Sequence, residues 1–122
     1  HWTNRRQWLL SGSGLDRPEI LAGLPVRRLL AFSEKLSSNK DMAATSLDIL
    51  ALWVRDLLVW RYRPHRVVNQ DLREVIQRAS AGKTVDQLHR MLDIILQARK
   101  DLGANRNPRL CLDHMMLGLA GV

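Results

Sequence analysis

The chain has 122 residues, of which 46% are hydrophobic and 25% charged, and its formal net charge is +7. This length suits a single domain, and this composition argues against a disordered chain. No apolar run approaches the length of a bilayer crossing, so we expect no membrane-spanning segment. The single cysteine, Cys111, excludes an internal disulfide and should be a buried small hydrophobe in a reduced, cytoplasmic setting.

The first quarter of the chain predicts short helices separated by turns. A helix is expected near Trp2–Ser11, and the stretch SGSGLDRPE that follows supplies turn residues. Pro18 should open a short helix that ends near Gly23, and Pro25 another that continues through VRRLLAFSEKLSS. No segment alternates with a period of two, so no strand is predicted.

The longest helix is predicted from Lys40 to Tyr62, and Pro64 stops it. Apolar residues, including its tryptophans, cover more than half of its circumference, which is typical of a central helix with neighbours on several sides. The remaining side is expected to gather the charged residues Asp41, Asp48, Arg55, Asp56 and Arg63.

Two more helices follow in the second half of the chain. One is expected over Gln70–Ala81 and ends at Gly82. Thr84, with Gln87 three residues later, forms a capping box that opens the next helix, and an apolar stripe continues from there to Gly103.

The segment GANRNPRL predicts the start of a final helix. Asn107 can cap it, with Asn105 as the alternative cap, and Pro108 suits the first helical position, where no N–H is needed. The apolar run that follows should be buried on most of its faces. The fold class is therefore all-α, a single helical bundle of about five or six helices.

The domain is expected to cover residues 1–122, with residues 1–24 as a loosely packed lead-in. Because the chain begins with His1 and not with methionine, we expect it to be the C-terminal fragment of a longer protein.

No catalytic, metal or cofactor site is predicted. Gly82-Lys83-Thr84 matches the end of a phosphate-binding loop, but Gln77 replaces the glycine that the motif requires, and no strand precedes it. The four histidines are dispersed and lack metal-ligand spacing. No nucleophile or convergent pair of carboxylates accompanies them.

The positive charge admits two interpretations. Most basic residues are scattered, which indicates a solvated surface, whereas the cluster Arg61–Arg66 favours an independent basic helical DNA-binding module. Arg61 lies within the apolar arc of the central helix, so its side chain either extends to solvent or forms an ion pair between subunits.

Two motifs carry a resemblance to a known family. The chain resembles, from about Arg5 to Leu119, the C-terminal domain of the bacterial DNA polymerase III delta-prime subunit. The stretches that occur there in the same order are SLDILALWVRDLLVWRY, VVNQDLREVI and ARKDLGANRNPRLCLDHMMLGL. The residues that carry the match are Trp53, Val54, Arg55, Asp56 and Leu57, with Asn105, Asn107, Pro108, Arg109, Leu110, Leu112 and Asp113. The gamma/tau and delta subunits have related domains and are the alternatives.

The resemblance implies a non-catalytic collar domain of the clamp loader, the assembly that places the sliding clamp on DNA during replication. Its parent would be a subunit of the DNA polymerase III holoenzyme, a nucleotidyltransferase complex. Its partners would be the delta and gamma/tau collars, with DNA contacted indirectly through the assembly. The residues expected at or beside the contact between subunits are Trp53, Arg55, Asp56, Arg63 and Arg109.

Overall fold

The computed structural model describes residues 2–13 and 26–121. Its elements are α1 (Trp2–Ser13), α2 (Val26–Ser37), α3 (Lys40–Tyr62), the 3-10 turns η2 (Pro64–Arg66) and η3 (Gln70–Leu72), α4 (Arg73–Ala81), α5 (Val85–Gly103) and α6 (Pro108–Leu119). These residues form six α-helices and no strand, which confirms the predicted all-α fold. The short helix predicted between Pro18 and Gly23 lies outside the described residues.

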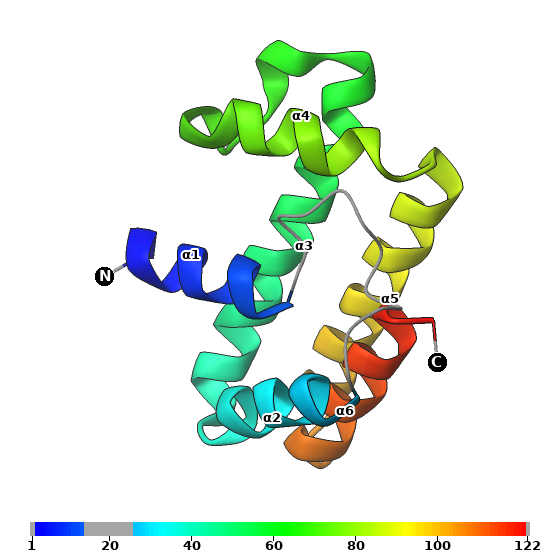
Figure 1. Cartoon of the computed structure of the whole chain (residues 1–122). Coiled ribbons are helices and arrows are strands. Elements are labelled where there is room, and N and C mark those ends of the chain that lie inside the picture. The colour runs from blue at the N-terminus through cyan, green and yellow to red at the C-terminus, as the bar shows by residue number, and fades with distance from the viewer. Residues whose placement is uncertain (1, 14–25, 122) are drawn as a thin grey trace.

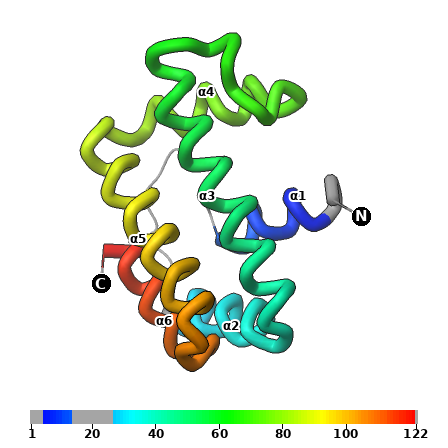
Figure 2. The backbone as a smooth tube through the Cα atoms, turned by 180° about the vertical axis from the view of Figure 1, so that it is seen from behind, coloured from blue at the N-terminus to red at the C-terminus, as the bar shows by residue number. Residues whose placement is uncertain are grey.

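Helix α3 is the central helix of the bundle. It runs along most of the molecule, with α2 near its N-terminal end, α1 beside its middle and α4 across its C-terminal end (Figure 1). Helix α5 returns antiparallel to α3 and makes the most extensive contact with it (Figure 2). Helix α6 then packs between α5 and α2.

The core is built around α3 and α5, and every helix contributes to it. Its largest fully buried side chains are Leu9, Leu29, Leu47, Leu50, Trp53, Leu57, Ile76, Leu88, Ile95, Leu102 and Leu112. Four of them come from α3, as its wide apolar arc predicts, and three come from the single apolar stripe of α5. Cys111 is also buried, and desolvation raises the pKa of its thiol.

Helix α1 is packed on the bundle by specific contacts. Leu9 is fully buried, and Arg5 donates hydrogen bonds to α3 at 2.6 and 3.1 Å. Gly12 lies against Phe32 of α2, where a Cβ atom would stand only 2.4 Å from the ring. This part of the predicted lead-in (1–24) is therefore well packed, and the rest of that lead-in lies outside the described residues.

The helix predicted over Gln70–Ala81 is divided into η3 and α4. Its first residues form a 3-10 turn because the preceding backbone is turned toward α3. There the N–H groups of Val68 and Asn69 donate hydrogen bonds to the Asp56 carboxylate. The regular α-helix begins only at Arg73.

The ends of α5 have clear local causes. The Thr84 hydroxyl accepts from the Gln87 N–H at 3.1 Å and the Gln87 side chain accepts from the Thr84 N–H at 2.8 Å, which completes the capping box. At the other end Asn105 has a φ of 61°, in the left-handed region that asparagine tolerates. The Asn105 N–H bonds to Leu102 O and the Arg106 N–H to Asp101 O, the pattern of a Schellman motif.

Asn107, and not Asn105, caps α6. Its side-chain oxygen accepts from the Leu110 N–H at 3.1 Å, and Pro108 occupies the first helical turn. Asn105 ends α5 instead, because its left-handed backbone turns the chain away from that helix.

We expect Asn107→Ala to lower the free energy of unfolding by about 1 kcal/mol, because it removes the acceptor for a free N–H of α6. Asn107→Ser keeps an acceptor oxygen and should change the free energy by much less. Urea denaturation followed by circular dichroism measures both. An equal loss from the two variants would show that the cap does not act through its side-chain oxygen.

Candidate functional site

The outer face of α3 carries a small groove. Arg55, Leu58, Val59 and Tyr62 occupy positions i, i+3, i+4 and i+7 of α3, which places them on one face, and Arg63 follows directly after the helix. Arg66 of η2 and His89 of α5 complete the lining. We call this cavity of about 250 Å³ the α3 groove.

The charge of the α3 groove is uniformly positive. Its lining contains three arginines and one histidine, and no aspartate or glutamate. Arg55 is half exposed and lies 3.3 Å from the carboxylate of Asp56, which is fully buried beneath it. The floor of the groove is apolar because Leu58 is 8% exposed and Val59 packs partly against the core.

The buried carboxylate of Asp56 organises the chain segment that follows η2. It accepts hydrogen bonds from the Val68 N–H at 2.9 Å, the Asn69 N–H at 2.8 Å and the Asn69 side-chain amide at 2.7 Å. A buried charge is tolerated only when such donors replace its lost hydration. Asp56 therefore fixes the loop between α3 and α4 in place.

The same network continues to α1. Arg6, which is 5% exposed, donates to Asn69 Oδ1 at 3.0 Å and to Asp71 Oδ1 at 3.0 Å. Hydrogen bonding to Arg6 lowers the pKa of Asp71 below its ordinary value. The stabilisation from this pair is therefore present above the unfolded pKa of the carboxyl and is lost as the pH falls through its folded pKa.

The residues expected at the contact between subunits are thus separated by the fold. Arg55 and Arg63 line the α3 groove, whereas Trp53, at 1% exposure, and Asp56, at 0%, lie inside the bundle. Asp56 does lie beside Arg55 on the charged side of α3, but it is fully buried there, because its carboxylate is bound by the loop N–H groups. Arg109 on α6 does not line this groove and pairs with Asp113 at 3.0 Å.

Arg61 and Lys83 join the C-terminal ends of α3 and α4. The Arg61 guanidinium donates to the Ser80 hydroxyl at 3.1 Å, and also to the carbonyl oxygens of Ser80 and Lys83. Lys83 is 3% exposed, and its Nζ donates to the Ala79 carbonyl at 3.2 Å. Both cations therefore donate hydrogen bonds to carbonyl groups at the end of a helix, where the helix dipole also favours positive charge. In the Gly-Lys-Thr segment, Gly82 therefore ends α4 and Thr84 caps α5.

A second and larger groove lies between α5 and α6. We call this cavity of about 940 Å³ the α5–α6 groove. Its apolar lining includes Ile94, Leu110 and Met115, and the carboxylates of Asp86 and Asp93 also line it. Leu110 is 67% exposed, which is unusual for a large apolar side chain on a helix that is otherwise well buried. Sequence reasoning did not predict this groove.

The described residues contain no group of three or more metal-ligating side chains. His65, His89 and His114 are exposed on three different elements, and His1 lies outside the described residues. In residues 2–13 and 26–121, no helix has the length and apolarity that a bilayer crossing requires.

Comparison with known proteins identifies a family. The family model described as DNA polymerase III, delta subunit, C terminal, matches residues 19–120, which include everything from α2 to α6 and hence both grooves. No curated protein and no solved structure gave a significant match. The matched model names the delta subunit, whereas the motifs of the sequence favoured delta-prime. Because the match covers most of its length, the chain belongs to the family formed by the C-terminal domains of DNA polymerase III delta subunits.

Proposed function

We propose that this chain is the collar domain of a clamp-loader delta-prime subunit and that it joins neighbouring subunits without catalysing a reaction. The observation that carries the clamp-loader role is the family match over residues 19–120. The order of the tryptophan-containing helix and the asparagine-proline signature favours delta-prime, whereas the matched family model is that of the delta subunit. The domain would act in the cytoplasm, bind the collars of delta and gamma/tau, and reach DNA only through the assembled complex.

The surface of α3 supports a role in assembly. Arg55 and Arg63 stand beside half-buried Val59, and a mixture of arginine, aromatic and apolar groups is typical of the centre of a protein interface. Trp53 and Asp56 contribute from beneath this surface, because they hold α3 and the loop after it in position. Arg109 would contribute separately, from α6.

The alternative of an independent DNA-binding module has weaker support. Of the cluster Arg61–Arg66, Arg61 is bound to the carbonyl oxygens of Ser80 and Lys83. Fewer cations of the cluster are therefore free to contact phosphates than the sequence suggests. DNA affinity with a steep salt dependence would nevertheless favour this alternative.

Size-exclusion chromatography tests the proposed assembly. Mixed with delta and gamma/tau collar domains at about 50 µM, the chain should elute in a complex, since association with a Kd near 10 µM is detectable there. Arg55→Glu should weaken this complex about ten-fold or more, because it reverses a charge at the contact. Arg28→Glu, on the exposed face of α2, is the matched control and should leave it unchanged.

The assembly role is wrong if no complex forms at this concentration while duplex DNA binds tightly and is released by salt. The delta-prime assignment is tested separately by adding the chain to reconstituted loaders that lack either delta or delta-prime. Restored assembly only in the loader without delta-prime is expected, and restoration only in the loader without delta would contradict it.

A further inference from the structure

The α3 groove combines two features that point to a definite kind of occupant. Its volume of about 250 Å³ lies below the range of pockets that hold whole small-molecule ligands, so it suits one or two side chains. Its floor is formed by Leu58 and Val59, and Tyr62 at its edge is 69% exposed. An apolar side chain would therefore be buried there on binding.

The rim of the α3 groove attracts negative charge. Arg63 and Arg66 make no side-chain hydrogen bond or ion pair with any described residue, and both are exposed. Arg55 faces Asp56, but that carboxylate already accepts three other hydrogen bonds and so offsets the charge of Arg55 only in part. No acidic side chain lines the groove to neutralise the rest.

We propose that the α3 groove docks an acidic segment of a neighbouring subunit. One large apolar side chain of that segment enters beside Val59 and Tyr62, and carboxylates on either side of it pair with Arg63 and Arg66. Bidentate arginine–carboxylate pairs would fix the register of the segment, while the apolar side chain supplies most of the affinity. This proposal rests on the proposed function, since it takes the occupant to be part of another clamp-loader subunit.

A polypeptide fits this groove better than nucleic acid does. Phosphate contacts need cations and polar donors along several nucleotides. A phosphate bound at the rim would leave the apolar floor of the groove exposed to water. Binding of single strands uses successive aromatic platforms, whereas this groove has one aromatic residue, Tyr62. Duplex DNA is accordingly the competing outcome of the test.

A displayed library of random 12-residue peptides tests the proposal. Peptides selected on the whole chain should carry aspartate or glutamate on both sides of a leucine, phenylalanine or tryptophan. A synthetic peptide of the recovered sequence should bind about ten-fold or more weakly to the variant Arg63→Glu/Arg66→Glu, because charge reversal replaces attraction with repulsion.

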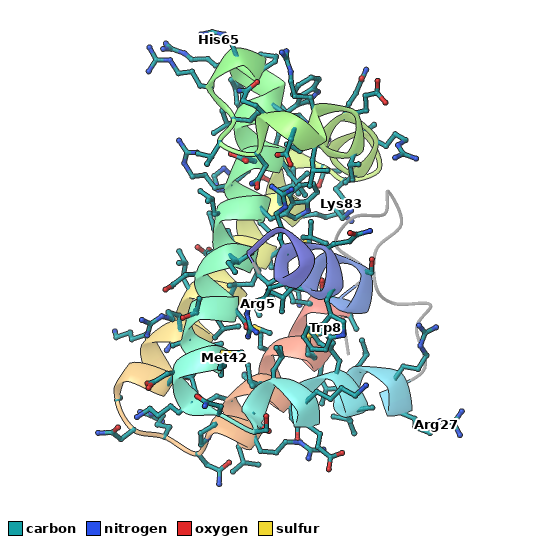
Figure 3. The ribbon with its side chains drawn as sticks, turned by 90° about the vertical axis from the view of Figure 1, so that its left-hand side faces the viewer. Arg5, Trp8, Arg27, Met42, His65 and Lys83 are labelled. Atoms are coloured by element: carbon teal, nitrogen blue, oxygen red, sulfur yellow. The ribbon has the colours of Figure 1, made fainter. Side chains whose placement is uncertain are left out.

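The matched control is Arg27→Glu/Arg28→Glu, which makes the same change in net charge on an exposed part of α2. Arg27 lies near the opposite end of the molecule from His65, which is next to Arg66 (Figure 3). This variant should bind the peptide within about two-fold of the original chain, because charges farther apart than a Debye length are screened at physiological salt. If the groove variant melts early, Arg63→Gln/Arg66→Gln removes the charge with less disturbance and takes its place.

Four outcomes would overturn the proposal. The selected peptides could lack acidic residues, or the two charge-reversal variants could bind the peptide equally. Alternatively, the groove variant could lose affinity for a 20-base-pair duplex while no peptide binds. If the groove variant still forms the complex with the delta and gamma/tau collars, the groove is not the docking site, although the assembly role stands.

Discussion

Replacing Asp56 with asparagine should lower the free energy of unfolding by roughly 3–5 kcal/mol, the range for disrupting a buried, hydrogen-bonded charge. The carboxylate accepts three hydrogen bonds from residues 68 and 69, at 2.7–2.9 Å. Asparagine supplies one acceptor oxygen and one donating amide, so at least one loop N–H would face another donor. A loss of this size is a large part of the stability of an ordinary domain.

Asp48→Asn is the matched control for Asp56→Asn. Asp48 lies on the same helix and pairs with Arg99 at 3.0 Å, but its side chain is 61% exposed. An exposed pair contributes at most about 1 kcal/mol, so this variant should be close to the original chain in urea denaturation. Equal and small effects from both substitutions would show that the carboxylate of Asp56 does not hold the loop.

Leu112→Ala should destabilise the chain by about 2–5 kcal/mol. Leu112 of α6 is fully buried in the core, where the helix packs between α5 and α2. Truncation removes the transfer free energy of the side chain and leaves a cavity that its neighbours fill only in part. Thermal unfolding followed by circular dichroism measures the loss directly.

Leu110→Ala, two residues earlier on the same helix, is the control for Leu112→Ala. Leu110 is 67% exposed at the edge of the α5–α6 groove, so its truncation should change the free energy of unfolding by only about 0.5 kcal/mol. If Leu110→Ala were as damaging as Leu112→Ala, the orientation of α6 in the bundle would have to be different.

The helices could be predicted because their causes are local. Thr84 and Asn107 accept hydrogen bonds from N–H groups three residues later, and Tyr62 ends α3 directly before Arg63 and the proline that follows. The wide apolar arc of α3 correctly predicted a helix with neighbours on several sides. Each of these signals depends on residues within a few positions of each other.

The environment of Asp56 could not be predicted in the same way. A helical wheel places it with Arg55 and Arg63 on the charged side, yet its partners are N–H groups at positions 68 and 69. Those donors reach the Asp56 carboxylate only because the chain reverses after Tyr62. No periodic pattern in the sequence predicts the geometry of that reversal. The exposure of Arg55, by contrast, follows from the wheel, whereas Arg63 lies just beyond the end of α3.

Both grooves depend on how helices pack against each other. The α3 groove needs His89 of α5 beside α3, and the α5–α6 groove needs the angle at which α6 meets α5. Sequence alone does not give these angles, because several crossing geometries suit the same apolar stripes. Leu110, an apolar residue one turn after the Asn107 cap, lies at the edge of the larger groove and is exposed there.

The network of Asp56, Asn69 and Arg6 has a consequence for how this family can evolve. Each member bonds to the next, so losing one would remove a hydrogen bond from a buried polar group of its neighbour. Single substitutions at these positions should be removed by selection, and an apolar residue at position 56 should be removed even when position 69 changes with it, because the backbone N–H groups of residues 68 and 69 would lose their acceptor. We therefore expect relatives to keep an acid at position 56, an amide at position 69 and a basic residue at position 6 together, although positions 6 and 69 are 63 apart in the sequence.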